Sequence, residues 1–396
     1  MSGSSVVIEG SNTDGALTID GPDASLQTAG QILVGIGGSA NASVTLSNRA
    51  TISDVNILAI GFAASSGSNT LTIQDGSTVS NIASAVGVSS GAVGGVTLRD
   101  QGSSWTTDFL ALGGYSAGQQ GGTGTVSVTN DASLVVGGEL RFFTAASSLT
   151  VNRATLRVGG LASDAGIAPT VRIRNPGSST ALTIDSPANT SFTFNGVIAD
   201  DGSAGGIVKR GPGEQIFTAQ QTYTGGTRVE AGTLTLGTHD TLVPTSVITL
   251  AGGTLNLQGN TQRTGTFTLG GGTVVGSATS LLLPATLNLQ SGTLAAPVVS
   301  SGAVTKTTAG SVSVSTADRG NARCQRGHAH ARQGRDGRQR LGDRRHAPTE
   351  GCRRRHVVER GSSGTVALVG PAIFSSSASL AGPLNVAGHA RALHRT

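Results

Sequence analysis

The residues best suited to chemistry lie in one basic block between residues 318 and 360. The block contains the only two cysteines of the chain, each followed four residues later by a histidine: Cys324, His328, Cys352 and His356. Two thiols and two imidazoles form the ligand set of a structural zinc site, and His328 with His330 is a second possible metal pair. The block also holds 13 Arg against 5 Asp or Glu, and such clusters attract nucleic acid.

A shifted reading frame explains this block more simply than a site does. A coding sequence for Val-Asn-Ala-Gly-Thr-Leu-Thr-Leu-Ala-Lys, read in another frame, can give the ten residues from Cys324 to Gln333. That peptide is typical of the repeats upstream, so we predict that the frame shifts near residue 317. Residues 318–396 then form an Arg-rich, disordered tail with no zinc or nucleic-acid site. A solvated basic tail is the alternative. Translation of the other reading frame tests the prediction, because further Gly-Thr-Leu repeats should then appear downstream.

Two acidic sites upstream of the block are candidates for catalysis. Asp200 and Asp201 form an adjacent acidic pair, and glycoside hydrolysis requires two carboxyl groups at a fixed separation. His239 lies beside Asp240, which is part of what a hydrolase triad needs. The first pair lies in a Gly-rich connector and the second precedes Pro244, so we expect both to be turn residues. We therefore predict no catalytic, cofactor or metal residue.

Two aromatic residues are candidates for binding. Trp105 and Tyr115 either lie on an exposed binding face or stack at the end of one coil of the fold; the sequence leaves the receptor unknown.

The composition indicates short strands rather than a conventional core. Gly accounts for 60 of 396 residues, charged residues for 12% and aromatic residues for 3%. β-Branched residues fit pleated strands and Gly supplies positive φ at turns, although a disordered Gly/Ser-rich chain has a similar composition. No apolar stretch reaches the roughly 18 residues of a membrane helix, and the start of the chain shows no signal peptide.

Regular spacing favours order over disorder. An apolar–Thr/Ser–apolar unit recurs at intervals of 27, 27, 25, 30 and 23 residues, beginning at Leu17, Val44, Leu71, Val96, Val126 and Leu149. A second unit recurs every 26 residues as Val34-Gly35, Ile60-Gly61, Val86-Gly87 and Leu112-Gly113. Segments such as Asp75-Gly-Ser between them are typical turns. Two units that keep one period indicate stacked structural repeats.

The second half of the chain has a shorter repeat. Gly-Thr followed by an apolar residue recurs 21, 19 and 20 residues apart, at Gly232, Gly253, Gly272 and Gly292. A repeat of this length without helical periodicity fits one coil of a β-solenoid, which buries its apolar face only by stacking on the next coil. We predict coils over 1–163 and 206–317, joined by an irregular connector over 164–205.

Residues 206–237 carry a family resemblance. They contain Lys209, Gly211 and Gly213, then Thr222-Tyr-Thr-Gly-Gly-Thr, and end in Ala231-Gly-Thr-Leu-Thr-Leu. This pattern resembles the autotransporter-associated β-strand repeat. A partial second copy begins at Gly302, where Lys306 and Gly310 keep the separation of Lys209 and Gly213.

The resemblance implies an all-β fold, a right-handed parallel β-helix of the pectin-lyase-like kind. It implies a passenger of a Gram-negative bacterium, exposed at the outer membrane or secreted, although no translocator barrel is recognisable after residue 317. We expect a non-enzymatic stalk or adhesin without cofactors. Its partners would be components of host or neighbouring cell surfaces, with self-association through the ends or sides of the helix. The alternative is a carbohydrate-active β-helix, either lyase-like or a phage tailspike.

Overall fold

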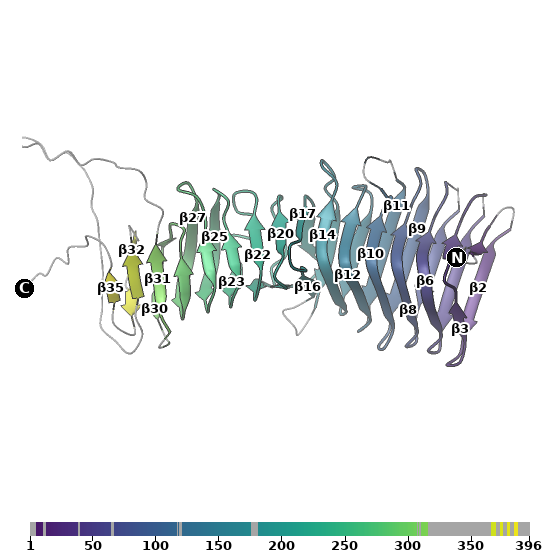
Figure 1. The fold of residues 1–396 in the computed structure, drawn as a ribbon, viewed down its shortest axis with the longest axis horizontal. Coiled ribbons are helices and arrows are strands. Elements are labelled where there is room, and N and C mark those ends of the chain that lie inside the picture. Colours follow the sequence, from purple (N-terminus) through teal and green to yellow (C-terminus); the bar gives the residue numbers. More distant parts are fainter. Residues whose placement is uncertain are drawn as a thin grey trace, which may run out of the picture.

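The structure, a computed structural model, is a rod of parallel β-strands. It describes residues 5–315, apart from 11–12, 39, 65–66, 117, 119–120, 176–180, 307 and 309, and four further strands between residues 366 and 386. The described strands stack along the rod in chain order from the N-terminal end (Figure 1). The described residues include no helix that could cross a membrane.

Three large sheets and one small one make up the rod. Sheet A comprises β1 (Val6–Ile8), β3 (Ser25–Gln27), β4 (Gln31–Val34), β6 (Thr51–Ile60), β8 (Thr78–Val86), β10 (Ser104–Leu112), β12 (Ser133–Phe142), β14 (Thr155–Ser163), β16 (Leu182–Asp185), β19 (Ile207–Arg210), β21 (Thr227–Val229), β23 (Val247–Leu250), β25 (Thr261–Leu269), β27 (Leu281–Leu289), β30 (Val304–Lys306) and β34 (Ala378–Leu380). Sheet B comprises β2 (Gly15–Asp20), β5 (Ala42–Ser47), β7 (Asn69–Ile73), β9 (Val93–Arg99), β11 (Thr123–Thr129), β13 (Ser148–Asn152), β15 (Thr170–Arg174) and β18 (Val197–Asp200). Sheet C comprises β17 (Ser191–Phe194), β20 (Glu214–Phe217), β22 (Thr233–Leu236), β24 (Thr254–Asn256), β26 (Thr273–Val275), β28 (Gly292–Leu294), β31 (Val312–Ser315), β32 (Val366–Val369) and β35 (Leu384–Val386). The small sheet pairs β29 (Val299–Ser300) with β33 (Ile373–Phe374).

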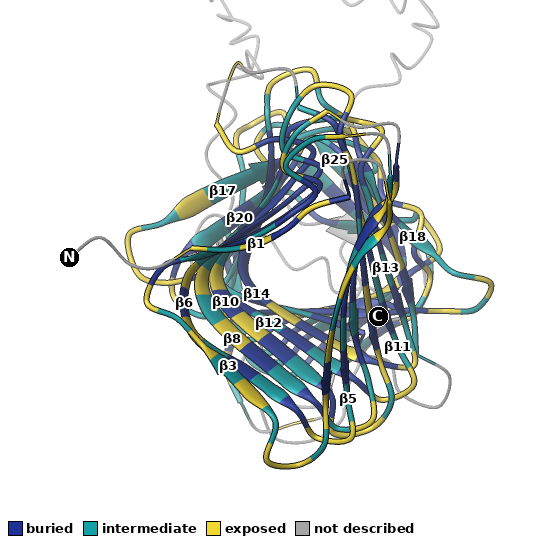
Figure 2. Cartoon of the chain, turned by 90° about the vertical axis from the view of Figure 1, so that its right-hand side faces the viewer, coloured by how far each residue is buried: buried dark blue, intermediate teal, exposed yellow. Residues whose placement is uncertain are grey.

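The coils wrap around a common axis, as the end-on view shows (Figure 2). The long strands of sheet A bend and cover two sides of the rod: β6 pairs with β3 through its first residues and with β4 through its last. Sheet B closes the third side in the N-terminal half. All of these pairings are parallel, which confirms the predicted parallel β-helix.

The sequence repeats correspond to the strand register. The repeat residues Leu17, Val44, Leu71, Val96, Val126 and Leu149 pair one after another in sheet B. Val34, Ile60, Val86 and Leu112 do the same in sheet A. Thr233, Thr254, Thr273 and Thr293 form the corresponding ladder in sheet C. Each sequence period is therefore one turn of the helix, and the predicted turn residue Asp75 has a positive φ of 54°.

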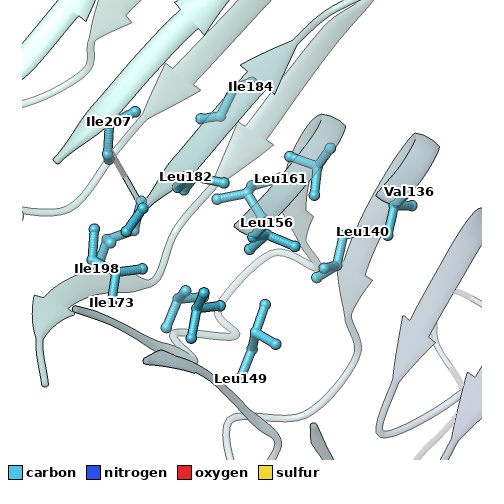
Figure 3. Packing of buried hydrophobic residues seen from close by; sticks show 14 of the residues in the cluster. Val136, Leu140, Leu149, Leu156, Leu161, Ile173, Leu182, Ile184, Ile198 and Ile207 are labelled. Atoms are coloured by element: carbon cyan, nitrogen blue, oxygen red, sulfur yellow. The ribbon is translucent and has the colours of Figure 1, made fainter. Parts of the chain in front are cut away.

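The core is a continuous column of aliphatic side chains. Most inward positions of the described coils are Val, Ile or Leu with almost no exposed surface. Figure 3 shows such packing between β12 and β19, where residues such as Leu156, Leu182 and Ile207 come from neighbouring coils. One coil cannot bury these side chains alone, so each coil is stabilised mainly by its two neighbours.

The connector over 164–205 is more regular than its sequence suggests, because it holds β15 to β18. Sheet B ends here at β18 and sheet C begins at β17, while sheet A continues through β16. Phe194 on β17 packs between Phe142 and Phe217, with ring centroids 5.9 and 6.4 Å away. Three of the chain's aromatic residues thus fill the place where the sheets change.

Buried glutamines complete the hydrogen bonding where a strand has no strand partner. The Gln215 amide accepts from the Leu161 N–H and donates to the Leu161 carbonyl, both at 3.0 Å. Gln262 makes the same pair of bonds with Leu242, at 3.0 and 2.9 Å. A primary amide offers the donor and acceptor of a peptide group, so these side chains replace the missing strand.

Candidate interaction surface

The outer face of sheet B carries an uncharged ladder of hydroxyl groups. One side chain from each of six successive strands stands in register and points outward: Thr18, Thr45, Thr72, Thr97, Ser127 and Thr150. Neighbouring parallel strands lie about 4.8 Å apart, so the hydroxyl groups repeat at that interval along the rod. We call these six residues the hydroxyl ladder. It is a regular polar surface on a rigid support.

The acidic pair of the connector has structural partners. The Asp200 carboxylate accepts from the Gly205 N–H at 3.0 Å and from the Thr224 hydroxyl at 2.6 Å, which joins the end of its strand to the next coil. Asp201 accepts from the Asn152 amide at 2.9 Å. The two carboxylates therefore bond to different parts of the main fold. Asp200 ends β18 instead of lying in a turn as expected, and Asp201 begins the bend that follows.

The His239–Asp240 pair is also held by the coil that follows it. The His239 Nδ1 accepts from the Thr261 N–H at 2.9 Å. Asp240 accepts from the Arg263 N–H at 2.8 Å and forms an ion pair with the Arg263 guanidinium at 2.5 Å. These bonds align two coils, and the Asp240 carboxylate is directed to Arg263 rather than to the imidazole.

Trp105 and Tyr115 lie in different environments. Trp105 is fully buried in the core, where its indole N–H donates to the Asn81 side-chain oxygen at 3.0 Å. It therefore belongs neither to a binding face nor to an aromatic stack at a coil end, because its inward phase on β10 places it inside. Tyr115 is 44% exposed on a loop between sheets A and B.

A shallow hollow lies at the bend of sheet A near the N-terminal end, with a volume of about 310 Å³. It is lined by Ser5, Ala29, Gly30, Gln31, Asn56, Ile57, Ile82 and Ala83. None of these side chains is ionisable, so the hollow has no general acid or base, and the only hydroxyl group in its lining is that of Ser5.

The predicted metal ligands cannot be placed in the fold. Cys324, His328, His330, Cys352 and His356 lie outside the described residues. Among the residues that are described, no three His, Cys, Asp or Glu side chains gather closely enough to hold a metal ion.

Two buried lysines were not recognised as core residues from the sequence. Lys209 is 0% and Lys306 2% exposed. The Lys209 ammonium donates to the carbonyl oxygens of Arg210 at 2.5 Å and Gly211 at 3.0 Å, and reaches Ala231 of the next coil at 3.4 Å. Lys209 follows Ile207 by two residues, but Val208 between them is also apolar and buried, so no alternation in the sequence marked the lysine as inward.

The lysine, the glycines and the Thr-Leu strand form one local unit. Gly232 has a φ of +64°, and a Cβ at that position would lie 2.8 Å from the Lys209 Nζ. The motif residues Lys209, Gly211 and Gly232 therefore meet at one corner between sheets A and C. This corner accounts for the spacing of the motif over two coils, β19–β20 and β21–β22.

Comparison with known families decides what this unit is. Residues 207–236 match the family model of the passenger-associated-transport-repeat. The chain carries an autotransporter passenger repeat. This confirms the resemblance over β19 to β22 and indicates an autotransporter passenger domain. No curated protein and no solved structure matches the chain.

Proposed function

We propose that this chain is a non-enzymatic passenger, exposed at the cell surface or secreted, that acts as a stalk and adhesin. The observation that carries the proposal is the hydroxyl ladder, which runs in register over six strands of a rigid parallel stack. The passenger repeat supports export, because repeats of this family belong to proteins carried to the outside of the cell.

The hydroxyl ladder suits adhesion to a polar surface. Its groups can each donate and accept a hydrogen bond, and most of the inward residues next to them on the same strands are buried. Many weak contacts at a regular spacing give avidity without any single strong site. We infer that the partners are polar components of host or neighbouring cell surfaces.

Substitution of the ladder tests this function. The triple variant Thr45→Asp, Thr72→Asp and Thr97→Asp places charge on sheet B. The matched control places the same charges on sheet C, at Thr254, Thr273 and Thr293. We expect about a tenfold loss of retention on a cell layer for the sheet B variant, equivalent to about 1.4 kcal/mol, and little change for the control. Equal retention by both variants would reject the ladder as the adhesive face.

The carbohydrate-active alternative has its own readout. The purified chain is incubated with acidic polysaccharides and the release of reducing or unsaturated ends is followed. We expect no turnover. Turnover that persists in the sheet B variant would show an enzyme with a site elsewhere.

A further inference from the structure

Lys209 and Lys306 bound one inward segment of a longer ladder in sheet A, which continues to Ile184 before the segment and to Leu380 after it. Strand pairing aligns the six residues of the segment in succession: Lys209, Val229, Leu250, Leu269, Leu289 and Lys306. All six are buried. The segment therefore consists of four aliphatic side chains between two lysines.

Both lysines reach toward the inside of this segment. Lys209 bonds to Ala231, in the coil that follows it. Lys306 donates to the Gln290 carbonyl at 3.0 Å, in the coil that precedes it, and to the Thr308 carbonyl in its own turn. Each ammonium thus connects its own coil to the neighbouring aliphatic coil, in opposite directions along the chain.

The aliphatic side chains of the segment do not by themselves specify its alignment at the two lysines. The sheet A strands at its two ends are short, with three residues each in β21 and β30. A slip of two residues keeps every apolar side chain facing inward, because the side-chain period of a strand is two. The packing of an aliphatic ladder therefore discriminates only weakly between the native and the slipped alignment.

A buried ammonium responds differently to the same slip. A shift of two residues moves the Lys209 Nζ by about 6–7 Å along the strand, away from the Ala231 carbonyl and from the space that Gly232 leaves open. The ammonium would keep the carbonyl oxygens of its own turn but lose its acceptor in the next coil and be crowded there, which costs more than a displaced methyl group. Buried polar groups are known to fix register in this way.

We propose that Lys209 and Lys306 are register-setting residues that lock the first and the last coil of this segment in a single alignment, while Gln262 and Asp240 hold its middle coils. The lysine of the passenger repeat then has a role in the fidelity of folding rather than in binding.

Disulfide trapping tests the proposal at Lys209. In a background with Cys324→Ser and Cys352→Ser, the pair Arg210→Cys and Glu230→Cys reports the native register, because these side chains meet at 2.6 Å. The pair Arg210→Cys and Arg228→Cys reports a slip of two residues. Diagonal neighbours lie about 7–8 Å apart in the native register, which is too far for a disulfide.

We expect only the native pair to oxidise when Lys209 is present, and the slipped pair to oxidise to a comparable extent in Lys209→Leu. The matched control Leu250→Met changes the same ladder without removing a charge, and should trap only the native pair. Native trapping alone in Lys209→Leu would overturn the proposal. Lys209→Met is the second variant: if both lysine variants lose the strand signal in circular dichroism while the control keeps it, Lys209 is a stability element and the proposal also fails.

Discussion

At the scale of single residues, the passenger repeat is a corner built around a buried charge. The Lys209 ammonium sits against carbonyl oxygens, and its space exists because position 232 has no side chain beyond Cα. Burial lowers the pKa of Lys209 to about 8, while the Asp185 carboxylate acts in the opposite direction. The Arg210 and Glu230 side chains, which flank this corner, neutralise each other in an ion pair. The lysine and Gly232 are therefore one structural feature.

Gly232→Ala tests the corner. The new Cβ would lie 2.2 Å from the Gly211 carbonyl oxygen and 2.8 Å from the Lys209 Nζ, at a positive φ. We expect a loss of about 1–3 kcal/mol in the free energy of unfolding, measured by urea denaturation. Gly118→Ala is the control, because it also has a positive φ but no atom within 4 Å. Equal losses of stability in both variants would show that backbone strain at a positive φ causes the loss, and not the contacts of Gly232 with Gly211 and Lys209.

The lowered pKa predicts a pH dependence. The unfolded chain keeps the Lys209 proton up to a pKa near 10.5, whereas the folded chain releases it near 8. Because the unfolded state binds more protons in this window, the free energy of unfolding rises with pH between about 8 and 9.5. The measurement is the urea midpoint of the wild type minus that of Lys209→Met, which cancels the other titrations. A difference that is constant or falls with pH would contradict the prediction.

At the scale of elements, side-chain amides hold the helix together where strands stop. The Gln262 side chain bonds to both main-chain groups of Leu242, a residue that belongs to no strand, so β25 gains a neighbour that the sheet does not provide. Gln221 acts in the same way on the Ile198 N–H of β18, at 2.7 Å. These contacts allow the third side of the rod to continue after sheet B has ended.

Gln262→Leu tests this substitute for a strand. The change keeps the volume but leaves the Leu242 N–H and carbonyl without partners. We expect a loss of about 1–3 kcal/mol in the free energy of unfolding, the cost of unpaired buried polar groups. Gln220→Leu is the control, because its amide bonds to the His239 carbonyl at an exposed site, and it should change stability by less than about 0.5 kcal/mol. Similar stabilities for the two variants would contradict the assigned role.

At the scale of the whole molecule, the rod is two stacks joined at one coil. Stability in such a fold is close to a sum of coil and neighbour contributions, so the contact between β14, β17 and β20 sets the coupling between the halves. The Phe142, Phe194 and Phe217 cluster lies at that contact. Of the four strands between residues 366 and 386, β34 extends sheet A, β32 and β35 extend sheet C, and β33 pairs with β29 in the small sheet. The rest of the tail predicted over 318–396 lies outside the described residues, and its disorder stays a prediction.

Phe194→Ala tests the coupling. Loss of a buried ring costs about 3–5 kcal/mol, and at this position it weakens the only shared aromatic contact of the described halves. We expect the single thermal unfolding transition to separate into two in calorimetry. Phe267→Ala removes an equally buried ring within the C-terminal stack and should lower stability without separating the transitions. A single transition in both variants would show that other contacts couple the two stacks.

The sequence by itself determined the strands, their period and their register, since the repeated Leu17, Val44 and Leu71 pair directly. This was possible because each coil contacts only its neighbours, so spatial order follows chain order. Only the tertiary structure showed that Trp105 and Lys209 belong to the core and that the sheets change between β14 and β20. These features depend on which polar groups meet across coils, as Gln215 and Leu161 do 54 residues apart. No local pattern encodes a partner at that distance.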